Sequence, residues 1–296
     1  MNNAFKTAVL LASLGALFMA VGAAFGGTSG LALGLLIGLV FCGGTYWFSD
    51  KLAIASARAK PVSRDEDPAL YAIVEDLARR ADVPMPRVFV SPEQQPNAFA
   101  TGRNPANAVV CVTQGIRELL PPDELKGVLA HEMAHVKHRD ILIGSVAAAV
   151  AMGITFLARM LMWGAMFGGE EDNNPFGIIG LLAMVILAPL AAGLIQMAIS
   201  RSREYDADEG GARMLGDGEP LARALEKIDV YAKKIPMVRV SPAQENAYII
   251  NPFQAPPPGN GRGGRGGARP QKSFGNYFRT HPPTEDRVAR LRAMTF

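Results

Sequence analysis

Two long apolar segments lie near the start of the chain, and each is long enough for a membrane-spanning helix. Residues 7–25 and 31–48 carry no charged side chain, and an α-helix needs roughly 20 apolar residues to cross a bilayer. The residues between them, Gly26-Gly27-Thr28-Ser29, are typical of a turn. The pattern therefore predicts a transmembrane helical hairpin over residues 1–50.

Small residues recur at four-residue spacing in both segments, which places them on one face of each helix. In lipid, helices associate by van der Waals packing, and small side chains allow close approach. We therefore expect the two small faces to pack together. They consist of Ala12, Ala16, Ala20 and Ala24 in the first segment and Gly30, Gly34 and Gly38 in the second. A signal peptide cleaved near Ala23-Ala24 is the alternative for the first segment.

Two further apolar segments, 141–158 and 178–199, predict a second transmembrane hairpin over residues 141–200. Basic residues follow both hairpins: Lys51, Arg58, Lys60 and Arg64 after the first, and Arg201 and Arg203 after the second. Because basic residues accumulate on the cytoplasmic side of membrane proteins, we expect this side and both termini in the cytoplasm. The chain is predicted to be mainly α-helical and multi-pass, with four transmembrane helices.

The remaining segments, 51–140 and 201–296, indicate a cytoplasmic domain in two parts. In the first part, residues 68–81 predict a helix, and 87–90 and 108–113 predict strands. A small sheet before a helix can bind an extended peptide along its edge, or it can simply pack on the helix. The candidate edge-strand residues are Asn97, Ala98, Phe99 and Ala100.

The clearest chemical signal is His131-Glu132-Met133-Ala134-His135, within a predicted helix from Asp123 to Asp140. Histidines four residues apart lie on one helix face and can bind one metal ion. Imidazole suits zinc, and a catalytic zinc needs three protein ligands and an open position for water. Glu132 is placed to act on that water as the catalytic base.

The third ligand is expected outside this helix. His138 lies about 10 Å along the helix axis from His131 and cannot easily share the ion. Glu204 and Asp208 stand four apart on one face of a predicted helix after the fourth apolar segment. Glu204 can complete the metal site, and Asp208 can orient a ligating histidine. The alternative is a solvated acidic helix face.

Composition agrees with a membrane protein. Of the 296 residues, 49% are hydrophobic and 19% charged, which is fewer charged residues than the usual quarter. The net charge of +3 is too small to indicate a nucleic-acid partner. The two cysteines, Cys42 and Cys111, indicate no disulfide framework.

Four separated motifs resemble the bacterial HtpX membrane metalloproteases, relatives of the CAAX prenyl proteases. In chain order they are residues 97–103, 131–135, 204–208 and 280–287. The resemblance implies a zincin-like α+β protease domain with a small sheet and an H-E-x-x-H helix. It also implies a task in quality control and stress response: cutting misfolded or damaged membrane proteins at the cytoplasmic face of the inner membrane.

Carried onto this sequence, the resemblance implies one Zn²⁺ per chain on His131, His135 and Glu204, with Glu132 as general base. It implies that Asp208 orients the site and that His281 and Arg287 lie near it. His281 either stabilises the developing oxyanion or is an ordinary residue at the entry to a helix. The expected partners are membrane-protein or other polypeptide substrates and the lipid bilayer, with no nucleic acid; no feature indicates an oligomeric state.

The chain departs from the resemblance at residues 251–272, a Pro-, Gly- and Arg-rich low-complexity segment. Such a segment cannot bury a core and is expected to be a loop. Its Arg-Gly-Gly repeats also allow RNA binding as an alternative. A structural zinc in a membrane scaffold is the other rival, but closed structural sites usually have four ligands, often cysteines. The sequence therefore favours a zinc endopeptidase.

Overall fold

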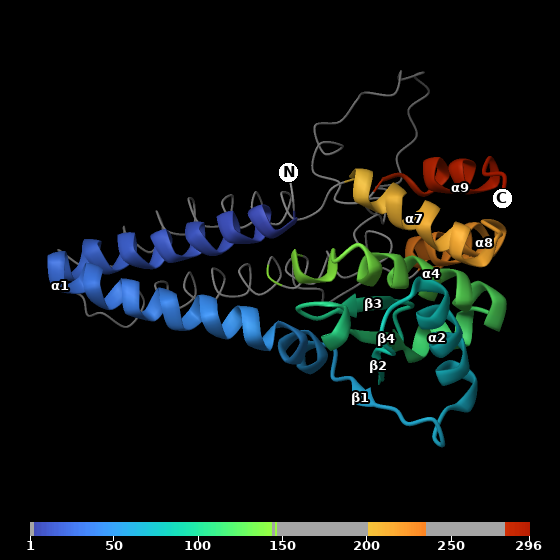
Figure 1. The fold of residues 1–296 in the computed structure, drawn as a ribbon, viewed down its shortest axis with the longest axis horizontal. Coiled ribbons are helices and arrows are strands. Elements are labelled where there is room, and N and C mark those ends of the chain that lie inside the picture. Colours follow the sequence, from blue (N-terminus) through green and yellow to red (C-terminus); the bar gives the residue numbers. More distant parts are fainter. Residues whose placement is uncertain (1–2, 144–145, 147–200, 235–281) are drawn as a thin grey trace, which may run out of the picture.

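A long helical hairpin projects from an α+β domain (Figure 1). The computed structural model describes residues 3–143, 146, 201–234 and 282–296. Helix α1 (Asn3–Ser56) is broken at Gly26 and Gly27, where Gly27 has a φ of 55°. The two arms of α1 run side by side (Figure 1). The two helices of the predicted hairpin are present, and the second continues as helix to Ser56.

The arms approach closely at glycines. A Cβ added at Gly34 would lie 2.3 Å from the carbonyl oxygen of Phe18, and one added at Gly30 would lie 2.0 Å from that of Gly22. The predicted glycine face of the second arm is therefore confirmed. The predicted alanine face of the first arm is wrong, because its backbone meets the second arm at Phe18 and Gly22, while the side chains of Ala12, Ala16 and Ala20 are exposed.

Within the described residues, one helical segment is long and apolar enough to cross a membrane. It is Gly26–Gly44, of which only 11% is buried, and the apolar part of the first arm, Leu11–Ala23, is shorter. The predicted spans 141–158 and 178–199 fall almost wholly outside the described residues.

The sheet has four strands in the order β1-β2-β4-β3. Strands β2 and β4 pair in parallel, while β1 and β3 are antiparallel to their neighbours. Strand β3 therefore lies at an edge, as predicted for the segment that contains it. The strands are β1 (Lys60–Pro61), β2 (Arg87–Ser91), β3 (Ala98–Thr101) and β4 (Val109–Thr113), with the short helices η1 (Pro105–Asn107) and α3 (Gln114–Leu119) on either side of β4.

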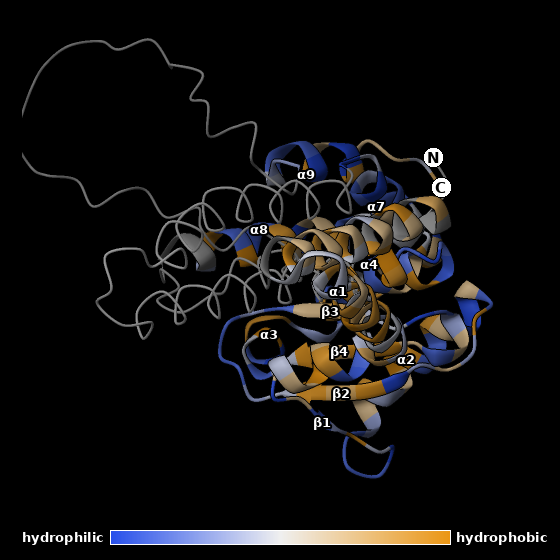
Figure 2. Ribbon diagram, turned by 90° about the vertical axis from the view of Figure 1, so that its left-hand side faces the viewer, coloured by the Kyte–Doolittle hydropathy of each residue, from blue (hydrophilic) through white to orange (hydrophobic). Residues whose placement is uncertain are grey.

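Helix α4 (Pro122–Lys137) is the centre of the domain. It contacts α2 (Pro68–Ala81), β3, α7 (Arg201–Leu215) and α8 (Glu219–Lys234), and α9 (Thr284–Arg292) packs on α7 and α8. Figure 2 shows β2 and β4 in hydrophobic colours and α9 mainly in hydrophilic ones. Because α4 is covered from several sides, eleven of its residues are buried.

Helix α4 ends at Lys137, earlier than the predicted Asp140. Arg139 adopts a left-handed conformation with φ 60°, which ends the helix and turns the chain back. The Asp140 N–H then donates to the His135 carbonyl oxygen at 2.9 Å. This turn places the Asp140 side chain beside His135.

Candidate metal centre

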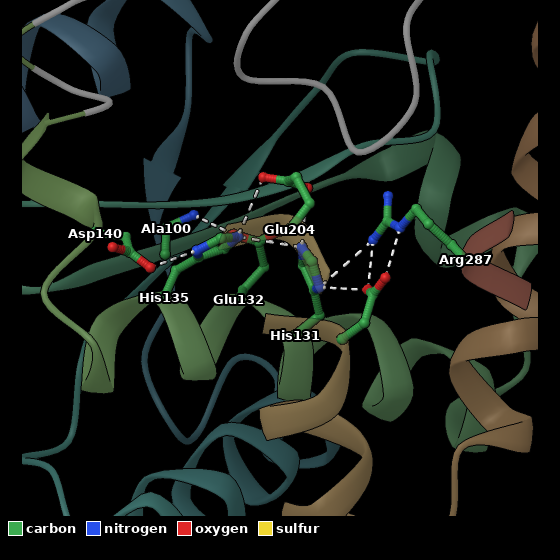
Figure 3. Close-up of polar contacts among 8 residues, drawn as sticks. Ala100, His131, Glu132, His135, Asp140, Glu204 and Arg287 are labelled. Carbon is green, nitrogen blue, oxygen red and sulfur yellow. Dashed lines mark hydrogen bonds and ion pairs between the residues drawn. The ribbon is translucent and has the colours of Figure 1, made fainter. Parts of the chain in front are cut away.

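Three ligand atoms from two helices converge between α4 and α7. The Nε2 atoms of His131 and His135 lie 3.2 Å apart, and each lies 3.7 Å from a carboxylate oxygen of Glu204. The histidines are one turn apart on α4, and Glu204 comes from the first turn of α7. Figure 3 shows the three side chains pointing toward one another. The structure thus brings together the three residues predicted as metal ligands.

These separations suit a single metal ion. Zinc binds histidine nitrogen and carboxylate oxygen at about 2.0–2.2 Å in tetrahedral sites, which places neighbouring ligand atoms about 3.3–3.6 Å apart. The 3.2 Å between the two Nε2 atoms, and the 3.7 Å from each of them to a different Glu204 oxygen, lie close to that range. Two histidines and one glutamate are also a donor set of catalytic zinc sites, in which a fourth position remains for water. The residues present therefore fit a metal ion.

The second ring nitrogen of His131 is held by a buried ion pair. His131 Nδ1 lies 2.9 Å from Asp208 Oδ1. Arg287, on α9, donates to the two Asp208 oxygens at 2.8 and 2.7 Å (Figure 3). Both side chains are almost fully buried. Burial would raise the pKa of Asp208, but the Arg287 charge and hydrogen bonds lower it to about 2. An ionised Asp208 thus accepts from Nδ1 and leaves Nε2 available to bind a metal ion.

Asp140 holds His135 in the same way, a role that the sequence patterns did not predict. Its carboxylate lies 3.2 Å from His135 Nδ1. Burial would lower the pKa of His135, but the hydrogen bond to Asp140 and the charges of Glu204 and Glu132 raise it to about 9. Surroundings that favour a proton on the ring also favour a bound cation. The available signal was an aspartate five residues after a predicted ligand, just beyond the helix.

Glu132 lies beside both histidines and faces the edge strand. The Ala100 N–H donates to Glu132 Oε2 at 2.9 Å (Figure 3). Glu132 is only 7% exposed, and burial raises its pKa, against the opposing effect of His131 and His135. A carboxylate with a raised pKa is a better proton acceptor than an ordinary one. The position suits the predicted role of a general base.

Small residues on α7 allow this convergence. A Cβ added at Gly211 would lie 2.8 Å from the His131 backbone nitrogen, and Ala207 is fully buried. The backbones of α7 and α4 therefore approach closely, which carries Glu204 and Asp208 to the histidines. A solvated acidic face is excluded, because both carboxylates are buried.

The other predicted residues fall in three places. Ala98, Phe99 and Ala100 lie on β3, and the buried Asn97 directly precedes it, with its N–H donating to Thr113 Oγ1 at 2.9 Å. His138 is exposed at the end of α4, as expected for a residue that is not a ligand. His281 and residues 251–272 lie outside the described residues.

Comparison with known proteins gives a consistent picture. The profile of Peptidase family M48 matches residues 64–295. A protease HtpX homolog of Syntrophobacter fumaroxidans is 48% identical, over 99% of this chain and 100% of that protein. A protease HtpX homolog of Pelotomaculum thermopropionicum is also 48% identical, over 99% of both chains.

Among solved structures, the chain is similar to the crystal structure of S. mikatae Ste24p. The TM-score is 0.51 at 20% sequence identity, and the match covers 97% of this chain. The chain spans 64% of the length of that protein. At this identity the likeness concerns the fold alone.

Proposed function

The chain belongs to peptidase family M48 and is a membrane-associated metallopeptidase, and from this premise we propose that it is a zinc endopeptidase of membrane-protein quality control. Its substrates are misfolded or damaged membrane proteins, cut at the cytoplasmic face of the bacterial inner membrane. The observation that carries the proposal is the convergence of His131, His135 and Glu204, with Glu132 beside them.

His131, His135 and Glu204 would hold the zinc ion. When bound, zinc supplies a Lewis acid that polarises the scissile carbonyl and lowers the pKa of water. Asp208 and Asp140 hold the two imidazole rings by their Nδ1 atoms. Fixed ring orientations keep the two Nε2 atoms at the separation that one ion requires.

Glu132 accepts the proton of the attacking water and returns it to the leaving amine. Its buried position and raised pKa suit both steps. A general base of this kind contributes about 10² to 10⁴ in rate. The hydrogen bond from Ala100 N–H to Glu132 keeps the carboxylate at the edge of β3.

Substrate binds along β3 as an added strand. The side of β3 away from β4 is the sheet edge, and an extended peptide can bind there through main-chain hydrogen bonds. The edge ends beside Glu132, because the Ala100 amide that faces away from β4 donates to that carboxylate. A peptide paired with β3 therefore passes next to the base and the metal ligands.

The hairpin supports action close to the membrane. The apolar segment Gly26–Gly44 is largely exposed, and the helix that contains it continues to Ser56, where the chain enters the sheet. Figure 1 shows the second arm ending beside β1 and β3. The catalytic domain is thereby attached to a membrane anchor without a long linker. Basic residues after Gly44 support a cytoplasmic position for the domain.

The test uses purified full-length protein in proteoliposomes with a single-span membrane protein whose cytoplasmic segment is unfolded. We expect wild type to bind about one zinc per chain and to cleave this segment. Glu132→Gln should keep the zinc and lose at least about 100-fold in rate. Glu118→Gln is the matched control, because Glu118 is exposed on α3, and it should cleave normally. Cleavage by Glu132→Gln at the wild-type rate would refute the assigned base, and a zinc-loaded wild type without cleavage would refute the function.

A further inference from the structure

Two cations near the membrane end of the domain stand over exposed aromatic rings. The Lys51 ammonium lies 5.0 Å from the centroid of the Phe48 ring, and Arg103 Cζ lies 4.7 Å from that of Trp47. Trp47 is 57% exposed and Phe48 is 51% exposed. Aromatic side chains and long cationic side chains both accumulate at the boundary between lipid and water.

Three neighbouring arginines, in contrast, form ion pairs with carboxylates. Arg58 pairs with Glu93, Arg64 with Glu75 and Arg87 with Asp50. Within the part of the chain that the structure describes, neither Lys51 nor Arg103 has a carboxylate partner. Arg103 donates one hydrogen bond, at 3.2 Å, to the neutral side chain of Asn107. Lys51 and Arg103 thus retain positive charge that protein carboxylates do not neutralise.

Their position relative to the membrane anchor is defined by the hairpin. Trp47 follows the apolar segment, which ends at Gly44, by about 4.5 Å of helix rise. Arg103 comes from the loop directly after β3, and β3 contacts α1. Arg103, on the loop after β3, therefore reaches Trp47 at the end of the membrane anchor.

We propose that Trp47, Lys51 and Arg103 form a binding site for the phosphate headgroup of an anionic phospholipid. The two cations supply the charge complementarity, and the exposed rings of Trp47 and Phe48 supply contact with the upper acyl chains. Headgroup binding at Arg103 would fix the membrane-facing end of β3. The consequence for cleavage rests on the proposed function, whereas the lipid binding itself does not.

The binding test uses tryptophan fluorescence. The chain has two tryptophans, Trp47 and Trp163, so an inactive Glu132→Gln protein with Trp163→Phe reports on Trp47 alone. This parent protein is placed in two sets of phosphatidylcholine vesicles. One set contains brominated phosphatidylglycerol, and the other contains brominated phosphatidylcholine at the same molar fraction. One cation near an anionic surface enriches anionic lipid on the order of fivefold. We expect the phosphatidylglycerol probe to quench Trp47 at least threefold more strongly.

Two double variants test the residues. Lys51→Gln with Arg103→Gln should bring the quenching ratio close to one. Arg79→Gln with Arg213→Gln is the matched control, because both arginines are exposed and pair with carboxylates of their own helices; it should keep the ratio. Equal quenching by both lipids in the parent protein would overturn the proposal, as would equal effects of the two double variants. If inorganic phosphate at about 10 mM abolishes the difference, the site binds the free anion and the lipid assignment fails.

Two further measurements keep the result interpretable. If Trp163→Phe impairs folding, the variants are compared in protein that keeps Trp163. The quantity measured is then the amount of phosphatidylglycerol retained per chain, determined by mass spectrometry. Cleavage by active protein is then compared with and without phosphatidylglycerol. If the two brominated lipids quench differently but no lipid supports cleavage, the proposed function is refuted and the lipid site is supported. If the protein cleaves its substrate but the two lipids quench equally, the lipid site is refuted and the proposed function is supported.

Discussion

Replacing Arg287 by methionine tests how much the buried ion pair between Arg287 and Asp208 contributes to the stability of the fold. Arg287 and Asp208 are each 1% exposed, and two hydrogen bonds of 2.8 and 2.7 Å join them. Methionine keeps much of the side-chain volume but leaves the Asp208 carboxylate buried without its cation. Removing one partner of a buried ion pair costs about 3–5 kcal/mol of unfolding free energy. In a chain of this size, that lowers the unfolding midpoint by about 6–20 °C.

The buried thiol of Cys111 provides the assay. Cys111 is fully buried, and burial raises its pKa to about 12, so the thiol is unreactive until the domain opens. A fluorogenic maleimide added during heating then reports unfolding, in a Cys42→Ala background that removes the other thiol. Arg287→Lys keeps the charge but loses the paired hydrogen bonds, and its midpoint should lie between wild type and Arg287→Met.

A double variant separates stability from metal binding. Arg287→Met with Asp208→Leu removes the unpaired charge and should recover most of the lost stability. His131 then lacks its acceptor, so zinc affinity should fall about 10–100-fold. A midpoint for Arg287→Met within about 2 °C of wild type would refute the energetic reasoning. Full zinc affinity in the double variant would refute the orienting role of Asp208.

Three further outcomes are expected. Asp140→Ala should lower zinc affinity about 10–100-fold by releasing His135 Nδ1, measured by chelator competition against Asp286→Ala as control. Gly34→Val should destabilise the hairpin by about 1–3 kcal/mol, because a Cβ there would meet the Phe18 carbonyl; Gly43→Ala, with open space around it, should have little effect when helix loss on heating is followed by circular dichroism. Lys126 and Arg80 lower the pKa of Asp76 to about 2, so this carboxylate stabilises the fold above about pH 4 and loses that effect as the pH falls toward 2. The difference in unfolding midpoint between wild type and Asp76→Asn should therefore shrink between about pH 5 and pH 2, and a constant difference would contradict this.

Local patterns predicted much of what the structure shows. The hairpin follows from two charge-free segments, and α2, β2, β4 and α7 follow from periodicity and β-branched runs. Ligands within one helix are equally local, since His131 and His135 are a turn apart. Glu204 was predictable because it stands four residues from Asp208, on one face of a predicted helix that follows the fourth apolar segment.

Features that depend on tertiary geometry were harder to predict. The role of Asp140 depends on the left-handed conformation of Arg139, which no residue preference requires. The contact of Arg287 with Asp208 joins residues 79 positions apart, and only the family resemblance placed Arg287 near the site. The prediction that the alanine face of the first arm packs on the second arm was wrong. Four-residue spacing shows where small side chains lie on a helix, but it does not show which part of the backbone contacts a neighbouring helix.

The position of Arg287 in the chain also has a consequence for biosynthesis. The ribosome synthesises His131, His135 and Glu204 before it reaches α9. A nascent chain therefore holds every metal ligand before Asp208 has its cation and before His131 has its full support. Asp208 acquires its buried cation only after α9 has been translated and has docked on α7 and α8. The order of translation therefore completes the support of His131 last, after all three candidate ligand residues have been made.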